Sequence, residues 1–295
     1  MNKKVHLLSA NSNNVNGLEF FVKKAFRQIG WEVLETDYRV MSKELVDTRI
    51  KYITDCDFLL CIKGERIKPE SIFSCRVPKI LWMQDAIQVN QEANFVIQEK
   101  SSVFDIVFAF NDADLPFYKQ FNENSYFLPL AADPDIHKLI ENENKLIDVG
   151  FVGSLNNNRI NMINYLLDKG IPVQYNYSID KYSEIVSNTK ININIGKISS
   201  GFQQRIFEIV SMGGFLLTNR VDGIELLQDK EHLIYYNDFN NLYELICYYI
   251  DKPEEMNKIA KKGRDEILNN NTYVHRINSI IDELIIYNNM RWYNE

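Results

Sequence analysis

Cysteine is scarce in this chain, with four residues among 295, and no two of them form a Cys-x-x-Cys pair. No histidine lies near them in sequence, so we expect reduced thiols rather than a zinc site or a disulfide framework. Long apolar runs are also missing, since no stretch approaches the roughly 20 residues that cross a bilayer. The apolar run after the first lysines spans only about five residues, too short for a signal peptide. We therefore expect a cytoplasmic protein with no membrane span.

Positive charge is in deficit as well. The chain has 33 lysines and arginines against 40 aspartates and glutamates, a formal net charge of −7. This balance argues against a broad nucleic-acid-binding face, so nucleic acid is not an expected partner. The hydrophobic content of 45% and charged content of 25% are those of a globular protein. The length suits two domains of about 120–170 residues.

Short apolar runs alternate with helical patterns through the first half of the chain. This β-α-β rhythm predicts an α/β fold with a parallel sheet and helices on both faces. Ligands bind such sheets at the carboxyl ends of the strands. The polar residues that follow the strands, and that we therefore expect to face a ligand, are Asn11, Asn14, Lys63, Asp85 and Asn111. The expected strands are 5–10, 31–36, 58–62, 79–83, 105–110 and 126–130.

A second alternation follows a linker at Pro134 and a charged run at 141–145. The sequence thus predicts two doubly wound parallel-sheet domains in series, with a ligand cleft between them. From Pro253 onward the pattern is almost wholly helical. The expected strands of the second half are 148–152, 173–177, 191–195, 215–217 and 233–236. The expected helices of the two halves include 91–100, 112–121, 178–190 and 224–227.

The stretch from Gly201 to Asn219 reads as a helix, a glycine stop and a buried strand. Arg205 and Glu208 lie one turn apart on that helix. An arginine for a diphosphate and a carboxylate for ribose hydroxyls are what a sugar-nucleotide enzyme needs. The competing interpretation is an ordinary surface ion pair worth a few tenths of a kcal/mol.

Two further groups have both a functional and an ordinary interpretation. Gly153 and Ser154 follow a strand and precede a helix that carries Arg159, an arrangement that lets backbone amides approach a phosphate. It also fits a simple strand-to-helix turn. Asp85 ends the strand at 79–83, where a carboxylate can accept a proton from an incoming hydroxyl. A helix-cap or turn aspartate is the alternative.

Several of these segments together resemble the C-terminal domain of glycosyltransferases of the GT-B fold. The closest likeness is to the CgeB-like group (spore maturation protein type), related to glycosyltransferase families 1 and 4. The connection at 127–134 is also similar to the interdomain connection of that group. The resemblance implies two Rossmann-like domains, 1–133 for the acceptor and 134–272 for the nucleotide sugar. It also implies a C-terminal helix, 273–295, that packs back on the first domain. The matching segments are 148–154, 191–195, 204–208 and 213–218.

The resemblance also implies roles for individual residues. Glu208 stands where the second glutamate of a Glu-x7-Glu motif bonds the ribose, but the first glutamate falls at Ser200, so the full motif is absent. Arg205 would be near the diphosphate, with Lys197 as a second positive charge. Asp85 and Arg205 are the expected catalytic residues. Gly153, Ser154 and Arg159 would lie on the other side of the diphosphate, and Asn11 and Asn14 on the acceptor side.

The function implied is a hexosyl-type glycosyltransferase that moves a sugar from a nucleotide-diphosphate donor, a UDP-sugar, to a hydroxyl-bearing acceptor. The acceptor class stays open between a glycan, a protein and a small molecule. Neither a metal nor another cofactor is expected, because arginine, lysine and helix N-termini can neutralise the leaving diphosphate. Ser200 keeps a second interpretation open, a non-catalytic nucleotide-sugar-binding protein. A GT-B-like sugar-nucleotide epimerase is a third, and the acidic composition argues against a transferase acting on DNA bases.

Overall fold

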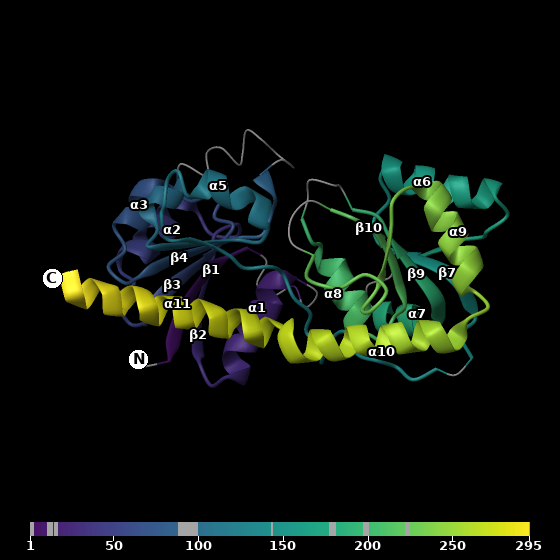
Figure 1. Cartoon of the computed structure of the whole chain (residues 1–295). Helices are drawn as coiled ribbons and strands as arrows, with labels where there is room; N and C mark the ends of the chain where they lie inside the picture. The colour runs from purple at the N-terminus through teal and green to yellow at the C-terminus, as the bar shows by residue number, and fades with distance from the viewer. Residues whose placement is uncertain are drawn as a thin grey trace. The chain divides into compact units, whose positions relative to one another are not determined.

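The computed structural model describes residues 3–10, 14, 17–87, 100–142, 144–176, 181–196, 201–221 and 225–294. Asn11, Lys197, Ser200 and most of the helix expected at 91–100 lie outside the described residues. The chain forms two compact units (Figure 1). The first unit comprises Met1–Leu130, Ser199–Gly201 and Tyr273–Glu295, and the second comprises Ala131–Ile198 and Phe202–Thr272.

The first unit contains a six-stranded sheet in the order β2-β1-β3-β4-β5-β6. All five neighbouring pairs are parallel, as the β-α-β rhythm predicts. The carboxyl ends of all six strands therefore lie at one edge of the sheet. The strands are β1 (Lys4–Ser9), β2 (Glu32–Asp37), β3 (Phe58–Ile62), β4 (Lys79–Met83), β5 (Ile106–Ala109) and β6 (Ser125–Phe127).

Helices cover both faces of this sheet. The long C-terminal helix α11 (Tyr273–Asn294) packs against α1 (Leu18–Gln28) on one face (Figure 1). Its first residue, Tyr273, lies 5.4 Å from the Phe21 ring and 6.5 Å from the Trp82 ring, centroid to centroid. The core of the other face lies beneath α2 (Lys43–Lys51) and α3 (Pro69–Phe73). The short α5 (Leu115–Tyr118) follows β5.

The second unit contains a five-stranded parallel sheet in the order β11-β10-β9-β7-β8. Its core is formed by the apolar residues of β7, β9 and β10 together with the inner faces of the surrounding helices. The strands are β7 (Ile147–Val152), β8 (Gln174–Asn176), β9 (Thr189–Asn194), β10 (Leu216–Asn219) and β11 (Ile234–Tyr236). The helices are α6 (Asn157–Asp168), α7 (Tyr182–Ser187), α8 (Gln204–Ser211), α9 (Phe239–Tyr249) and α10 (Pro253–Asn270).

Three expected helices differ from the sequence prediction. The helix expected at 112–121 is a 3-10 turn followed by the four residues of α5. Pro116 has no backbone N–H to continue a helix from residue 112, so it lies in the first turn of a new helix. Helix α8 begins at Gln204 rather than near 201, since Gly201 has φ +66° and is not helical. Residues 225–227 form no helix, because Glu225 and Asp229 pair with Arg220 and hold this segment by tertiary contacts. No helix in the described part of the chain has the length and apolar character to cross a membrane.

Candidate functional site

The carboxyl end of β7 carries a glycine that the neighbouring arginine requires. Gly153 follows the strand with φ +141°, a conformation that side-chain-bearing residues rarely adopt. A Cβ atom at this position would collide with the guanidinium of Arg205. The absence of a side chain thus lets Arg205 of α8 lie directly on the backbone at the end of β7.

Two arginines flank the same aromatic ring. The guanidinium carbons of Arg159 and Arg205 lie 5.5 and 5.7 Å from the ring centroid of the buried Phe151. Arg159 donates from Nη1 to the Ser154 carbonyl oxygen at 2.6 Å and lies 3.2 Å from its hydroxyl. Burial lowers the pKa of Arg159, and the positive charge of Arg205 lowers it further. Two neighbouring cations at a strand end form a site that favours an anion.

Arg159 retains an unused donor. Its Nε is buried and has no hydrogen-bond partner. Asn156 caps α6 by accepting the backbone N–H of Arg159 at 3.1 Å, which fixes the backbone from which this side chain reaches Ser154. The arginine in the first turn, unfavourable for the helix dipole, is therefore held beside Ser154 by local contacts.

Glu208 is not part of an exposed ion pair with Arg205. Its side chain is 14% exposed, and His137 Nε2 lies 3.4 Å from its Oε1. Gln204 Nε2 donates to the same oxygen at 2.7 Å. The surface-pair interpretation is therefore wrong for this helix, since Glu208 is a largely buried carboxylate whose contacts lie elsewhere.

His137 is the residue that the sequence patterns did not connect to Glu208. Its Nδ1 accepts the backbone N–H of Asp133 at 3.2 Å, which leaves the proton of the neutral ring on Nε2, facing Glu208. The ring meets Tyr182 edge-on at 6.2 Å. Burial raises the pKa of the Tyr182 hydroxyl well above its ordinary value, and the charge of Glu208 raises it further, whereas Arg205 acts in the opposite direction. These groups therefore share one electrostatic environment.

Side-chain amides line the neighbouring strand ends. Asn219, at the end of β10, accepts the Gly196 N–H at 2.7 Å and donates to the Gly196 carbonyl at 3.1 Å. Asn194, at the end of β9, donates to Thr218 Oγ1 at 3.1 Å, and its own Oδ1 is buried without a partner. The alternating Asn-Ile pattern of β9 predicted the strand but not this role.

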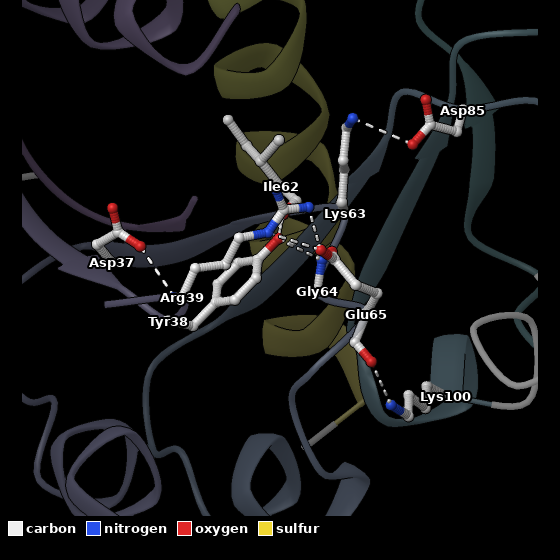
Figure 2. Close-up of polar contacts among 9 residues, drawn as sticks. All are labelled: Asp37, Tyr38, Arg39, Ile62, Lys63, Gly64, Glu65, Asp85 and Lys100. Carbon is white, nitrogen blue, oxygen red and sulfur yellow. Dashed lines mark hydrogen bonds and ion pairs between the residues drawn. The ribbon is translucent and has the colours of Figure 1, made fainter. Parts of the chain in front are cut away.

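In the first unit, Asp85 is paired with a lysine. Lys63 Nζ lies 3.1 Å from its carboxylate, and the Asp85 side chain is 55% exposed (Figure 2). Both residues follow adjacent parallel strands, β3 and β4. The pair therefore lies at the carboxyl edge of the first sheet, where ligand-binding residues were expected.

The turn that carries Lys63 has a strained backbone and is held by contacts with Tyr38 and Glu65 (Figure 2). Lys63 and Gly64 have φ values of +63° and +74°. The Tyr38 hydroxyl lies 3.1 Å from the Ile62 carbonyl oxygen and 2.8 Å from Glu65 Oε2. Burial alone would raise the pKa of Glu65, but hydrogen bonds from Arg39 and Tyr38 lower it overall. Glu65 is thus an ionised anchor for the turn.

The structure brings five of the expected site residues together in the second unit. Asp85 and Asn14 belong to the first unit, and Asn14 accepts the Gly17 N–H with its backbone oxygen at 2.7 Å. Among the described residues, no three histidine, cysteine, aspartate or glutamate side chains come together as a metal site. The five that share the carboxyl edge of the second sheet are Gly153, Ser154, Arg159, Arg205 and Glu208.

Comparison with known proteins is consistent with this geometry. Residues 137–282 match the family described as glycosyl transferase-like. No curated protein sequence matches the chain.

Solved structures that resemble the whole chain include the following three. HepE of Anabaena, in complex with UDP and glucose, has a TM-score of 0.71 at 13% identity and covers 96% of this chain and 99% of its own. An alpha-glucosyltransferase in complex with UDP-glucose and DNA containing an abasic site has a TM-score of 0.70 at 12% identity, covering 95% and 98%. Sucrose-phosphate synthase from Thermosynechococcus elongatus has a TM-score of 0.68 at 10% identity, covering 96% and 99%. The expected fold, GT-B with two Rossmann-like parallel sheets and a helical C-terminal tail, is thereby confirmed.

Proposed function

We propose, from the match of residues 137–282 to the family described as glycosyl transferase-like, that this protein is a glycosyltransferase that moves a hexose from a UDP-sugar to a hydroxyl group of an acceptor. The observation that carries the proposal is the pair of guanidinium groups on Phe151, at a strand end where Gly153 provides the space. Such a pair fits a diphosphate. The choice of UDP is supported by HepE and the alpha-glucosyltransferase, which are described in complex with UDP or UDP-glucose.

In the proposed reaction the bond between the sugar C1 and the diphosphate oxygen breaks, and a bond between C1 and the acceptor oxygen forms. The proton of the acceptor hydroxyl passes to a base, the role that we predict for Asp85, and UDP leaves with the extra negative charge. Arg205 and Arg159 stabilise that charge as it develops. Electrostatic stabilisation of this kind is usually the largest single contribution to the rate enhancement of an enzyme. We therefore propose that no metal ion is required.

Glu208 is proposed to bind the ribose hydroxyls of the donor. Its Oε1 is held by Gln204 and faces His137, so the carboxylate has a fixed orientation. A buried carboxylate of this kind is a strong acceptor for hydroxyl donors, since hydrogen bonds to charged groups are stronger than neutral ones. Lys197 and the first-unit residues Asn11, Asn14 and Asp85 stay predictions, the last three for the acceptor.

The test is a donor panel assayed with EDTA present. The purified chain is incubated with UDP-, GDP-, ADP- and dTDP-sugars, with and without a set of sugar acceptors, and nucleotide release and products are measured. We expect UDP release that depends on an acceptor, no turnover by Arg205→Ala, weakened donor binding by Glu208→Ala and unchanged turnover by the control Lys262→Ala. Lys262 pairs with Glu231 at 2.7 Å on the surface of the same unit.

The other outcomes distinguish the remaining interpretations. Conversion of the donor without an acceptor would indicate an epimerase. Donor binding without any product would indicate a non-catalytic binding protein. Wild-type turnover by Arg205→Ala would contradict the site.

A further inference from the structure

Two buried polar side chains at the carboxyl edge of the first sheet lack hydrogen-bond partners. Gln84 is 5% exposed, and neither its Oε1 nor its Nε2 has a partner. Ser9 is 1% exposed, and its hydroxyl also has none. Burying such groups without partners costs about 1–3 kcal/mol each, so proteins normally satisfy them. Structural packing does not explain a glutamine with both polar atoms unused.

Both side chains belong to the same face of the sheet. Gln84 follows Trp82 by two residues, and Trp82 packs on Tyr273 of α11, so the alternation of a strand directs Gln84 to the α11 side. Leu8 and Ala10 belong to the core of the opposite face, which directs Ser9 to the α11 side as well. Strand β3 lies between β1 and β4, so the two residues are roughly 10 Å or more apart.

The unused groups indicate the chemistry of their ligand. The Gln84 amide offers two N–H donors and an acceptor oxygen, and the Ser9 hydroxyl can act as donor or acceptor. A hydroxyl group both donates and accepts, so it satisfies such partners. One hydroxyl cannot reach both residues, but hydroxyls on two sides of a sugar ring, or of adjoining rings, can.

The rim of this edge carries charges of both signs, the cations Arg39, Lys63 and Lys100 and the carboxylates Asp37, Glu65 and Asp85 (Figure 2). Lys100 Nζ donates to the backbone oxygen of Glu65 at 3.4 Å. Lys63 pairs with Asp85, and Arg39 pairs with Glu65. Such a rim offers no net attraction to a phosphate-bearing chain such as nucleic acid. It is compatible with an uncharged ligand that enters past the half-exposed Asp85.

We propose that Ser9 and Gln84 bind hydroxyl groups of the acceptor, and that the acceptor is an uncharged, hydroxyl-rich molecule of the sugar class. This inference rests on the proposed function in one respect, namely that the bound molecule is the acceptor of the transferred sugar. The binding site itself rests on the two unpartnered side chains. Gln84 then determines specificity, because an acceptor that lacks the matching hydroxyl leaves the amide buried and unpaired.

The first test is thermal unfolding of the full chain without ligand. Gln84→Met keeps the length and removes both unused polar atoms, so we expect the Tm to rise by about 2–6 °C. The matched control is Asn122→Leu. Asn122 is also a buried amide of the first unit, but it donates to Phe104 O at 2.7 Å and Ser101 O at 3.1 Å, so its loss lowers the Tm. A lower Tm for Gln84→Met would show a structural glutamine and overturn the proposal.

The second test uses glucose as the probe in ligand-observed saturation-transfer NMR, with UDP affinity measured in parallel. We expect a glucose signal from the wild type that falls at least fivefold in Gln84→Met and in Ser9→Ala, with UDP affinity unchanged. An unchanged glucose signal in the variants, or none from the wild type, would overturn the acceptor class while UDP binding stands. If the wild type did not bind UDP, the result would instead contradict the proposed function.

Discussion

At the scale of single residues, the orientation of Glu208 depends on His137. The histidine Nε2 faces the carboxylate at 3.4 Å, while its Nδ1 is occupied by the Asp133 N–H. His137→Phe keeps an aromatic ring against Tyr182 but removes the donor. We expect UDP to bind about tenfold more weakly, because the carboxylate loses a contact that holds it in the orientation proposed for ribose binding. Titration calorimetry with UDP measures the change.

A positioning role can be separated from a structural one with a donor analogue. If Glu208 binds ribose hydroxyls, the 2′,3′-dideoxy analogue of UDP should bind equally to the wild type, His137→Phe and Glu208→Gln. The matched control is His232→Phe, because His232 Nδ1 accepts the Gln228 N–H at 3.2 Å in a similar turn of the same unit. Equal weakening of UDP and its analogue by His137→Phe would mean that His137 acts only on packing.

A second histidine makes the first unit sensitive to acid. His6 is buried in β1, 2.8 Å from the Thr36 hydroxyl, and burial lowers its pKa from 6.5 to about 4. The unfolded chain therefore binds a proton that the folded chain does not, so stability falls as pH decreases from about 6.5 to about 4. Arg49, the charge that acts on this imidazole, also disfavours its protonated form.

The measurement is the Tm of the full chain between pH 7 and pH 4. We expect the decrease in Tm to be smaller in His6→Gln than in the wild type, because glutamine does not titrate. Identical pH profiles for the two proteins would contradict the assigned pKa shift.

At the scale of elements, the turn from β7 to α6 is the part of the site most sensitive to a single methyl group. Gly153→Ala places a Cβ against the Arg205 guanidinium at a positive φ. We expect lower stability and at least tenfold weaker UDP binding, because Arg205 must move. Gly170 is the control, since it has φ +82° and open space around its added Cβ.

Gly170→Ala should cost only the backbone strain, about 1–2 kcal/mol, and leave UDP binding unchanged. Denaturant unfolding and calorimetry on both variants provide the comparison. Normal UDP affinity in Gly153→Ala would show that Arg205 does not need its place on the β7 backbone.

The elements also show what a sequence can predict. Strands β3 and β4 lie at the expected residues, 58–62 and 79–83, because continuous apolar runs between turn residues have few alternative structures. Helix α7 is shorter than its expected span of 178–190, and 225–227 is not helical, since tertiary contacts determine the ends of such weak helices. In the candidate site, the helical pattern of the sequence predicted that Arg205 and Glu208 lie one turn apart on one helix. His137, Tyr38 and Glu65 were not connected to it, because their contacts join segments far apart in the chain.

At the scale of the whole molecule, the chain combines a net charge of −7 with a local cluster of two arginines. The overall charge disfavours binding of anions, so a UDP affinity must come from the site itself. Ligand that binds only the folded chain adds about 2.7 kcal/mol at a hundred times its Kd, which makes UDP stabilisation a direct readout.

The measurement that tests the central claim most directly is the calorimetric titration of UDP into the full chain in EDTA. Wild type and Lys262→Ala should bind UDP with equal affinity, and Arg205→Ala at least tenfold more weakly. The absence of UDP binding by the wild type, or the same affinity in Arg205→Ala, would contradict the assignment of this strand edge as the nucleotide-sugar site.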